Sequence, residues 1–243
     1  MSQTQSEAFQ ELPWDSEHFG IKIGRVTQPS ADIIERAVKR AAVMGIDCLY
    51  LLADSNDAET LRSAAAAGFR MVDIRVTLSG NVPGASDEGS IRVAAAEDVP
   101  RLSRLAMQSH RDSRFYADGR FSTVRCDALF AAWIERSCTD RSFADQVFVA
   151  DVDGEPVGYV TCALKKEGLG EIGLIAVDQS HRSRGFGGAL LRRAFGWFLA
   201  QGAFRVQVVT QGSNVKALRM YERAGFRVDT VQVWFHWWRL DSD

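Results

Sequence analysis

The stretch that decides the fold is Glu171–Gly188, EIGLIAVDQSHRSRGFGG, together with the apolar run that follows it. Within it, Ile172–Val177 is rich in Ile, Leu and Val and predicts a buried strand. A polar, glycine-rich turn comes next, and Ala189–Leu199 then predicts an amphipathic helix. A strand, a glycine-rich turn and a helix in this order leave unpaired backbone N–H groups at the helix N-terminus, where the helix dipole favours an anion. We therefore expect a site for phosphate or pyrophosphate at this turn.

Two familiar glycine-rich patterns do not fit the turn. A P-loop ends in Gly-Lys-Ser/Thr, whereas this turn runs into Gly187-Gly188-Ala189. The dinucleotide fingerprint G-x-G-x-x-G follows the first strand of a βαβ unit, whereas only Gly185-x-Gly187 is present here, late in the chain. The pattern that fits is Arg-x-x-Gly-x-Gly, formed by Arg182, Gly185 and Gly187. For the turn alone, a glycine-rich helix start with basic neighbours and no ligand is the structural alternative.

Composition excludes several classes of protein. The chain has 243 residues and a net charge of −2, with no basic excess that would favour nucleic acid or an anionic membrane. Its four cysteines form no disulfide-like or metal-binding spacing, so we expect no metal site. No apolar run reaches membrane length and the first residues lack a signal-peptide pattern, so we expect a cytoplasmic protein.

The first half of the chain predicts a sheet with helices packed on it. Its expected elements are a strand at Ile21–Val26, a helix at Ala31–Met44, a strand at Asp47–Ala53, a helix at Asp57–Ala67 and a strand at Phe69–Leu78. This βαβαβ order favours a parallel or mixed sheet. Asn81–Ser90 is rich in Gly, Pro, Ser and acidic residues and is the best candidate for a linker. We therefore divide the chain into an N-terminal half, residues 1–88, and a second domain, residues 89–243.

A loop with several basic and aromatic residues is expected at His110–Val124. Guanidinium groups bind phosphate bidentately and aromatic rings stack, so this composition suits an anionic ligand that carries a ring. The candidate ligand-binding residues in the loop are Arg111, Arg114, Tyr116 and Arg120. A solvated charged loop is the alternative for each of them.

A second pattern lies near the end of the chain. It reads Asn214-x-x-Ala217-x-x-x-Tyr221-x-x-x-Gly225-Phe226, with Asn214 at the start of a predicted helix. Tyr221 follows seven residues later, two turns along the same helix face. Tyr221 alone is more simply explained as an aromatic core residue, but its order after the glycine-rich turn favours a functional role. The last strand, Val231–Trp238, is heavy in aromatic residues and is equally compatible with a dimer surface, an acceptor wall or core.

Residues from about 91 to 238 resemble the GCN5-related N-acetyltransferases (GNAT), through the Arg182–Gly188 loop and the Asn214–Tyr221 helix. This resemblance implies a mixed, mostly antiparallel central sheet flanked by helices, with residues 1–88 as a degenerate partial copy of that fold. The whole chain is similar to one branch, the TDP-fucosamine acetyltransferases, which acetylate a TDP-linked 4-amino-4,6-dideoxyhexose. The segments that carry the second likeness are Leu12-Pro13-Trp14-Asp15, Phe19-Gly20, Gln108-Ser109 to Arg114-Phe115, Arg120-Phe121 and Ala132-Trp133-Ile134-Glu135. The Arg-x-x-Gly-x-Gly pattern is stronger in this sequence than is usual in that branch. This departure supports CoA binding and leaves the identity of the acceptor open.

The resemblance also implies a set of functional residues. Acetyl-CoA is expected on the backbone of Ile175, Ala176 and Val177, on the loop residues Arg182, Ser183, Arg184, Gly185, Phe186, Gly187 and Gly188, and near Asn214 and Ala217. A backbone N–H near Ile175 would polarise the acetyl carbonyl. Tyr221 would protonate the departing thiolate, and Asp73, or else Glu171, would take the proton of the amine through water.

Other acceptors and one other class of function stay open at this point. The acceptor could be a protein N-terminus, a lysine, a polyamine or an aminoglycoside, although an arginine-rich loop disfavours polycations. A CoA-binding module without transferase activity is the alternative from a different class. A homodimer is possible.

Overall fold

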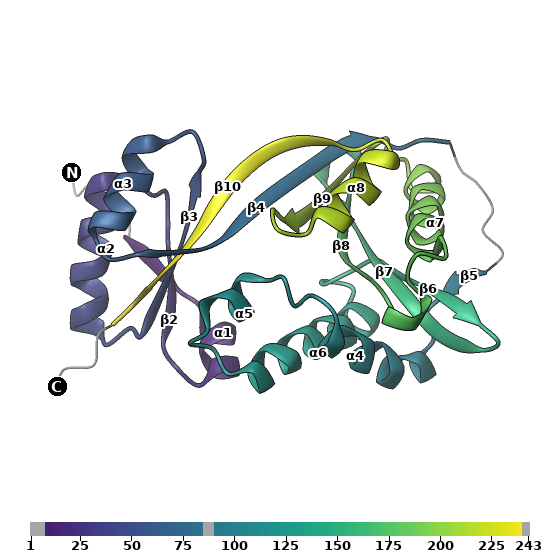
Figure 1. Cartoon of the computed structure of the whole chain (residues 1–243), viewed down its shortest axis with the longest axis horizontal. Helices are drawn as coiled ribbons and strands as arrows, with labels where there is room; N and C mark the ends of the chain where they lie inside the picture. Colours follow the sequence, from purple (N-terminus) through teal and green to yellow (C-terminus); the bar gives the residue numbers. More distant parts are fainter. Residues whose placement is uncertain (1–7, 85–89, 240–243) are drawn as a thin grey trace. The chain divides into compact units, whose positions relative to one another are not determined.

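The structure is a computed structural model that describes residues 8–84 and 90–239, and its chain divides into two compact units (Figure 1). Unit 1 comprises the described residues of Met1–Arg75, Ser113–Arg125 and Val231–Asp243. Unit 2 comprises Val76–Asp112 and Cys126–Thr230. The domain boundary expected between residues 88 and 89, and part of the expected linker, fall in residues 85–89, which lie outside the described residues. That division stays a prediction.

Unit 1 has strands in the order β1-β2-β3-β10-β4. Their bounds are Phe9–Glu11 (β1), Ile23–Val26 (β2), Cys48–Asp54 (β3), Arg70–Asn81 (β4) and Arg227–Trp238 (β10), of which β4 and β10 give residues to both units. Strand β2 runs parallel to β3, and β10 runs antiparallel to β3. The helices are Pro13–Phe19 (α1), Ala31–Met44 (α2), Ala58–Ala66 (α3) and Arg114–Asp118 (α5).

Local signals define helix α2 at both ends. The Ser30 side chain accepts a hydrogen bond from the Ile33 N–H and caps the first turn. Gly45 ends the helix in the left-handed conformation, with φ of 69°, and its N–H bonds back to the Ala41 carbonyl. Between these caps, one stripe of small and branched residues is buried against the sheet.

Alternation sorts the side chains of β3 and β10 between two faces of the sheet in unit 1. Leu49, Leu51 and Phe235 are buried in the core under α2 and α3. Tyr50 and His236 are paired across β3 and β10, so they share the opposite face. That face also carries Phe115 of α5, which is 6.3 Å from the Tyr50 ring. Phe235 and His236 of the aromatic last strand are therefore buried on opposite faces of this sheet, whereas its three tryptophans are only partly buried.

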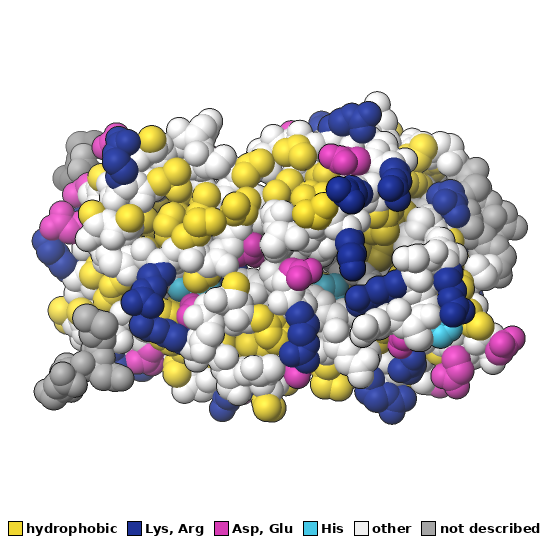
Figure 2. Space-filling model, viewed as in Figure 1, with side chains coloured by type: hydrophobic (Ala, Val, Ile, Leu, Met, Phe, Trp, Pro, Cys, Tyr) yellow, Lys and Arg dark blue, Asp and Glu magenta, His cyan; other side chains and the backbone are white. Residues whose placement is uncertain are grey.

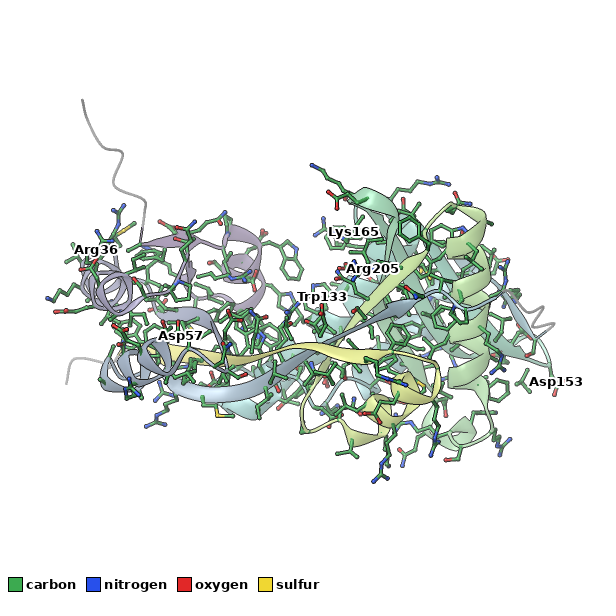
Figure 3. The ribbon with its side chains drawn as sticks, turned by 90° about the horizontal axis from the view of Figure 1, so that it is seen from above. Arg36, Asp57, Trp133, Asp153, Lys165 and Arg205 are labelled. Carbon is green, nitrogen blue, oxygen red and sulfur yellow. The ribbon has the colours of Figure 1, made fainter. Side chains whose placement is uncertain are left out.

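Unit 2 has strands in the order β4-β9-β8-β7-β6-β5. The further strands are Ile91–Val93 (β5), Gln146–Val152 (β6), Glu155–Lys165 (β7), Leu169–Val177 (β8) and Arg205–Gln211 (β9). The helices are Val99–Gln108 (α4), Thr123–Thr139 (α6, whose first three residues belong to unit 1), Phe186–Ala200 (α7) and Val215–Arg223 (α8), with 3₁₀ turns at Ala96–Asp98 (η1), Lys166–Gly168 (η2) and Gln179–His181 (η3). Asp153 and Gly154 adopt positive φ at the tip of the β6–β7 hairpin (Figure 3).

Helix α7 covers one face of this sheet and closes the core of unit 2. Its buried residues Leu190, Phe195 and Phe198 pack with Val160 of β7 and with Ile172 of β8. The opposite face of β7 carries Tyr159, whose hydroxyl lies 2.9 Å from His110 after α4. Strands β5 to β8 pair antiparallel and β8 pairs parallel to β9. The expected mixed, mostly antiparallel sheet flanked by helices is confirmed.

The expectation of an unstructured loop at His110–Val124 was wrong in its middle, where Arg114–Asp118 form α5. The short elements β1 and α1 were not expected either. No helix among residues 8–84 and 90–239 is long and apolar enough to cross a membrane. Figure 2 shows basic and acidic side chains interspersed on the visible face, as the net charge of −2 suggests.

Gly170 on β8 allows a test of the packing under α7. A Cβ atom at this buried glycine would lie 2.6 to 2.8 Å from ring atoms of Phe198. We expect Gly170→Ala to lower the free energy of unfolding by about 1–3 kcal/mol, because the core has no room for the methyl group. Urea-induced unfolding measures this. Gly84→Ala is the matched control, since a Cβ there meets nothing within 4 Å, and an equal loss in both variants would contradict the packing argument.

Candidate functional site: the gap between β8 and β9

The central feature of unit 2 is a place where two neighbouring strands part. Strand β8 pairs with β9 only from Leu169, opposite Arg205, to Ile172, opposite Val208. Beyond this point β8 continues to Val177 and β9 continues to Gln211, without further pairing in that ladder. Backbone groups of β8 that would bond to β9 are therefore left for another partner.

A β-bulge on β8 begins where the strands part. Val160 of β7 lies opposite Ile175, whereas Cys162 lies opposite Ile172, so Thr161 faces two residues of β8 instead of one. The Thr161 hydroxyl accepts a hydrogen bond of 2.8 Å from the Leu174 N–H. A Cβ on Gly173 would lie 2.7 Å from the same oxygen. Glycine at this position therefore lets the threonine hydroxyl occupy the bulge.

The hydrogen bonds on either side of the bulge show which way the backbone of β8 points. The N–H groups of Leu174 and Asp178 both bond to β7, the second to the Val157 carbonyl at 2.8 Å. Successive residues of a strand alternate, so the N–H groups of Ile175 and Val177 point toward β9, into the gap. The backbone of Ala176, the third predicted residue, points toward β7 instead. The Val177 carbonyl already accepts a bond of 3.0 Å from Arg182 Nε.

The turn after β8 is held by a carboxylate. Asp178 accepts hydrogen bonds from the N–H of Ser180 at 3.0 Å and from its hydroxyl at 2.6 Å. Arg101 NH2 of α4 lies 2.8 Å from the same carboxylate. The Ser180 hydrogen bonds, together with Arg101, lower the pKa of Asp178 to about 2. The turn that leads into the glycine-rich loop is therefore anchored on both sides.

The glycine-rich loop forms the N-terminus of α7, as the sequence predicts. Ser183 and Gly185 both adopt positive φ, 62° and 88°, and helix α7 begins at Phe186. Residues 182–185 are exposed. Gly187 has a different role from Gly185, because a Cβ there would lie 2.7 Å from the sulfur of Met220 on α8. The loop therefore presents its arginines and the N-terminus of α7 to solvent, while Gly187 allows the close approach of α8.

Helix α8 holds the predicted acid. Asn214 caps the helix, with its side-chain oxygen 3.1 Å from the Ala217 N–H. Tyr221 is 3% exposed and its ring lies 5.6 Å from that of Phe226. Burial raises the pKa of the Tyr221 phenol above its ordinary value, so the hydroxyl stays protonated at neutral pH. A protonated phenol is the form that a general acid requires.

The two candidate bases lie in different units. Glu171 belongs to the paired part of β8, opposite Gln207, and its carboxylate is 2.7 Å from Gln207 Nε2 and 3.0 Å from Lys165 Nζ. Asp73 belongs to β4 in unit 1. Asp73 shares a strand face with Arg75, whose NH1 bonds to the Gln232 side chain at 2.7 Å. Asp73 therefore lies on the face of unit 1 that carries Trp234 and His236 of β10.

The candidate acceptor residues are also divided between the units. Arg111 in unit 2 forms an ion pair of 3.1 Å with Asp127. Arg114, Tyr116 and Arg120 lie in unit 1, on or after α5. Arg114 is half-buried against aromatic rings, whereas Arg120 is exposed, with its guanidinium 5.5 Å from the Trp238 ring. The simple alternative of a solvated loop therefore does not hold for Arg114.

Sequence reasoning did not single out His110. Its Nε2 lies 2.9 Å from the Tyr159 hydroxyl and its ring stacks on Phe130 at 5.0 Å. Burial, with a smaller effect from Arg182, lowers the pKa of His110 to about 4, so the ring is neutral at pH 7. A single histidine after a helix carries no signal of this environment in the sequence, because Tyr159 is 49 residues away.

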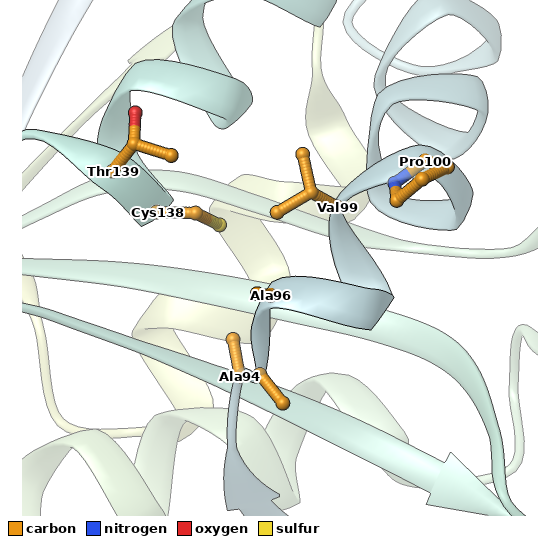
Figure 4. A pocket seen from close by; sticks show the side chains of 7 residues that line it. Ala94, Ala96, Val99, Pro100, Cys138 and Thr139 are labelled. Atoms are coloured by element: carbon orange, nitrogen blue, oxygen red, sulfur yellow. The ribbon is translucent and has the colours of Figure 1, made fainter.

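A separate hollow in unit 2 carries none of the predicted site residues (Figure 4). It is lined by Ala94, Ala95, Ala96, Val99, Pro100, Cys138 and Thr139. Burial raises the pKa of the Cys138 thiol to about 11, which makes it a poor nucleophile at neutral pH. Among the residues that the structure describes, no group of three or more His, Cys, Asp or Glu side chains could hold a metal ion.

Comparison with known proteins shows the family and the fold of the chain. The sequence pattern of the Acetyltransferase (GNAT) family matches residues 105–226. The chain is 27% identical to dTDP-fucosamine acetyltransferase of Escherichia coli over 236 residues, 94% of this chain and 97% of that protein. It is 27% identical to the spore coat polysaccharide biosynthesis protein SpsD of Bacillus subtilis, over 58% of this chain and 48% of that protein. A GCN5-related N-acetyltransferase of Sphaerobacter thermophilus has the same fold, with a TM-score of 0.62 and 18% identity over 91% of this chain and 74% of that one.

The anchor at Asp178 predicts a specific dependence on acid. Because its pKa is lowered in the folded state, the carboxylate contributes stability above its ordinary pKa of 3.8, and that contribution is lost as the pH falls toward about 2. We expect Asp178→Asn to lower the free energy of unfolding by about 1 kcal/mol at pH 7. The difference from wild type should shrink below about pH 4.

Urea-induced unfolding between pH 7 and pH 3 measures that difference. Asp153→Asn, at the exposed hairpin tip, is the control, and its difference from wild type should stay constant. If the effect of Asp178→Asn were the same at pH 7 and pH 3, the carboxylate would not be the anchor.

Proposed function

The chain belongs to the GNAT acetyltransferase family and is an acetyl-CoA-dependent N-acetyltransferase, and we propose that its acceptor is the amine of a nucleotide-linked sugar, a TDP-4-amino-4,6-dideoxyhexose. The observation that carries this proposal is the likeness to the E. coli dTDP-fucosamine acetyltransferase, which extends over 94% of the chain and thus includes unit 1. Relatives that share only the acetyltransferase region would not include the residues of unit 1.

The gap between β8 and β9 suits the cofactor. The N–H groups of Ile175 and Val177 point into it and can bond to the amide-containing arm of acetyl-CoA. The N–H groups of residues 182–188, in the exposed loop 182–185 and the partly buried first residues of α7, can hold the pyrophosphate, with Arg182 and Arg184 adding positive charge. Asn214 and Ala217 act less directly, since the Asn214 side chain is used to cap α8.

The proposed chemistry is a direct attack of the neutral amine on the thioester. The Ile175 N–H, left unpaired by the parting of the strands, polarises the acetyl carbonyl. A base must first take the proton of the amine, and we assign this step to Asp73, acting through water. Glu171 is the second choice because Lys165 and Gln207 already neutralise and bind its carboxylate. Tyr221 gives its proton to the departing thiolate.

The acceptor residues are assigned by charge. A TDP-linked sugar carries a diphosphate, and Arg111, Arg114 and Arg120 supply cations for which guanidinium–phosphate pairing is favourable. Tyr116 adds an aromatic hydroxyl from α5. A polyamine or an aminoglycoside would be repelled by the same arginines.

A panel of acceptors tests the proposed substrate. Release of free CoA thiol is measured with acetyl-CoA and, in turn, a TDP-4-amino-4,6-dideoxyhexose, a UDP-amino-sugar, spermidine, an aminoglycoside and short peptides. We expect selective turnover of the TDP-4-amino-sugar. Turnover of peptides or polyamines alone would discard the sugar, and binding of CoA without any turnover would favour a CoA-binding module.

The role of Tyr221 predicts a defined kinetic change. We expect Tyr221→Phe to lower kcat by about 10- to 100-fold, because CoA thiolate is a fair leaving group that needs only partial help from an acid. The KM for acetyl-CoA should change less than about 2-fold, since the hydroxyl acts on the leaving group rather than on binding. Steady-state kinetics measure both, with thermal unfolding as the control for the fold. Normal turnover by Tyr221→Phe would remove the assignment.

A further inference from the structure

A group of charged and aromatic side chains lies entirely in unit 1, whereas the gap between β8 and β9 belongs to unit 2. Arg25 of β2 and His236 of β10 both lie opposite Tyr50 of β3, so the three side chains share one face of the sheet. Helix α5 adds Arg114 to this face. Trp234 lies two residues before His236 on β10 and therefore on the same face.

Arg114 is surrounded by aromatic rings. Its guanidinium carbon is 4.1 Å from the ring centre of Tyr50, 4.2 Å from that of Phe115 and 4.3 Å from that of Trp234. The guanidinium of Arg25, which is exposed, lies 5.4 Å from the same Trp234 ring. One tryptophan thus contacts two cations. These contacts restrict Arg114 to one place without using its N–H donors.

A relay of hydrogen bonds fixes the orientation of Arg114. Its NH1 lies 2.8 Å from His236 Nε2. A guanidinium only donates, so Nε2 is the unprotonated nitrogen and the proton sits on Nδ1, which donates to the Asp118 carboxylate. The Trp238 indole N–H donates to the same carboxylate oxygen at 2.9 Å. Burial lowers the pKa of His236 to about 4, so the ring that Arg114 contacts is neutral at pH 7.

The positive charge of Arg114 is only partly compensated by unit 1. Its hydrogen bond goes to a neutral imidazole, and burial lowers the pKa of the guanidinium despite the carboxylate of Asp15 nearby. The Ser113 hydroxyl, one residue before Arg114, is buried without a hydrogen-bond partner among the described residues. A buried polar group without a partner needs an explanation, and a ligand that supplies the partner is one.

We propose that Arg114 and Arg25, which both contact Trp234, bind the diphosphate of a nucleoside diphosphate, and that His236 and Asp118 are positioning residues that hold Arg114 for this task. The proposal rests on the proposed function, because it names the part of unit 1 that recognises the acceptor. Two guanidinium groups match the two phosphates in charge and in donor geometry. Asp15 is the opposing charge on this face and limits binding to ligands that bring more than one negative charge.

Binding of thymidine diphosphate tests the proposal without any acetyl transfer. Isothermal titration calorimetry is run with and without saturating CoA. We expect wild type to bind thymidine diphosphate, and we expect Arg114→Lys and Arg25→Gln each to weaken binding by about 10-fold or more, through loss of charge-assisted hydrogen bonds. Arg36→Lys on α2 is the control, because this exposed arginine pairs with Asp32 and should leave binding unchanged. Arg25→Gln affects an exposed residue, so it remains informative if Arg114→Lys unfolds.

The positioning role has its own readout. We expect His236→Gln to raise the acceptor KM by about 10-fold, with kcat and the KM for acetyl-CoA changed less than about 2-fold, because only the hold on Arg114 is lost. The nitrogen chemical shifts of the His236 ring should show protonated Nδ1 and bare Nε2 in the wild type. Observation of the opposite tautomer would overturn the positioning role. An equal effect of His236→Gln on kcat, on the acceptor KM and on the KM for acetyl-CoA would also overturn it.

The outcomes separate the two proposals. Failure of wild type to bind thymidine diphosphate, or undiminished binding by both Arg114→Lys and Arg25→Gln, overturns the inference even if amino sugars are acetylated. Arginine-dependent binding without turnover of the TDP-4-amino-sugar keeps the inference and overturns the proposed function.

Discussion

The loss of pairing between β8 and β9 after Ile172 and Val208 is the constraint on which the site of unit 2 depends. Strand pairing satisfies backbone groups as a rule, so a gap inside a sheet exposes donors that need another partner. The bulge at Gly173 and Leu174 redirects the strand where the gap begins. Thr161 makes this bulge possible by bonding the Leu174 N–H through its side chain. The gap is thus specified by the bulge and its side-chain hydrogen bond and is not a frayed strand end.

The same strand places the glycine-rich turn, which we propose as the phosphate site, at the end of the gap. Because Asp178 fixes the turn that follows β8, the chain enters α7 with its first N–H groups exposed. Helix α7 must also lie close to the sheet, and Gly170 permits the contact with Phe198 that achieves this. Gly185 adopts the left-handed conformation that the turn requires. Gly187 allows the close approach of α8. A ligand held by backbone N–H groups tolerates many side chains, provided that these geometric positions are kept.

Local signals in the sequence were enough to predict much of this fold. Helix Ala31–Met44 was predicted with its exact bounds from its apolar stripe and the glycine that follows it, and the structure shows Ser30 and Gly45 capping its two ends. The order of strand, loop and helix around Arg182–Gly188 also followed from the sequence, since its signals are adjacent in the chain. What escaped prediction depends on distant residues. Helix α5 is too short to show a periodic pattern, and it is stabilised by contacts such as Phe115 with Tyr50.

The same contrast between local signals and distant contacts applies to the candidate site. Tyr221 and the loop could be named through patterns that resemble those of the GNAT family, whereas the surroundings of Arg114 could not be predicted, because its partner His236 is 122 residues away. The sequence suggested an arginine in a solvated or ligand-binding loop, and the ring contacts of Arg114 in unit 1 exclude the solvated loop. Glu171 was named from the sequence as a candidate base, but only the structure reveals that its carboxylate is bound by Lys165 and Gln207.

The most direct test of the account is amide hydrogen exchange with and without CoA. If the gap and the turn hold the cofactor, CoA should slow exchange at Ile175 and Val177 and across residues 182–188, while the amide of Leu174, already bonded to Thr161, should change little. Protection elsewhere in the described chain with no change at these amides, or no protection at any CoA concentration that supports turnover, would contradict the account.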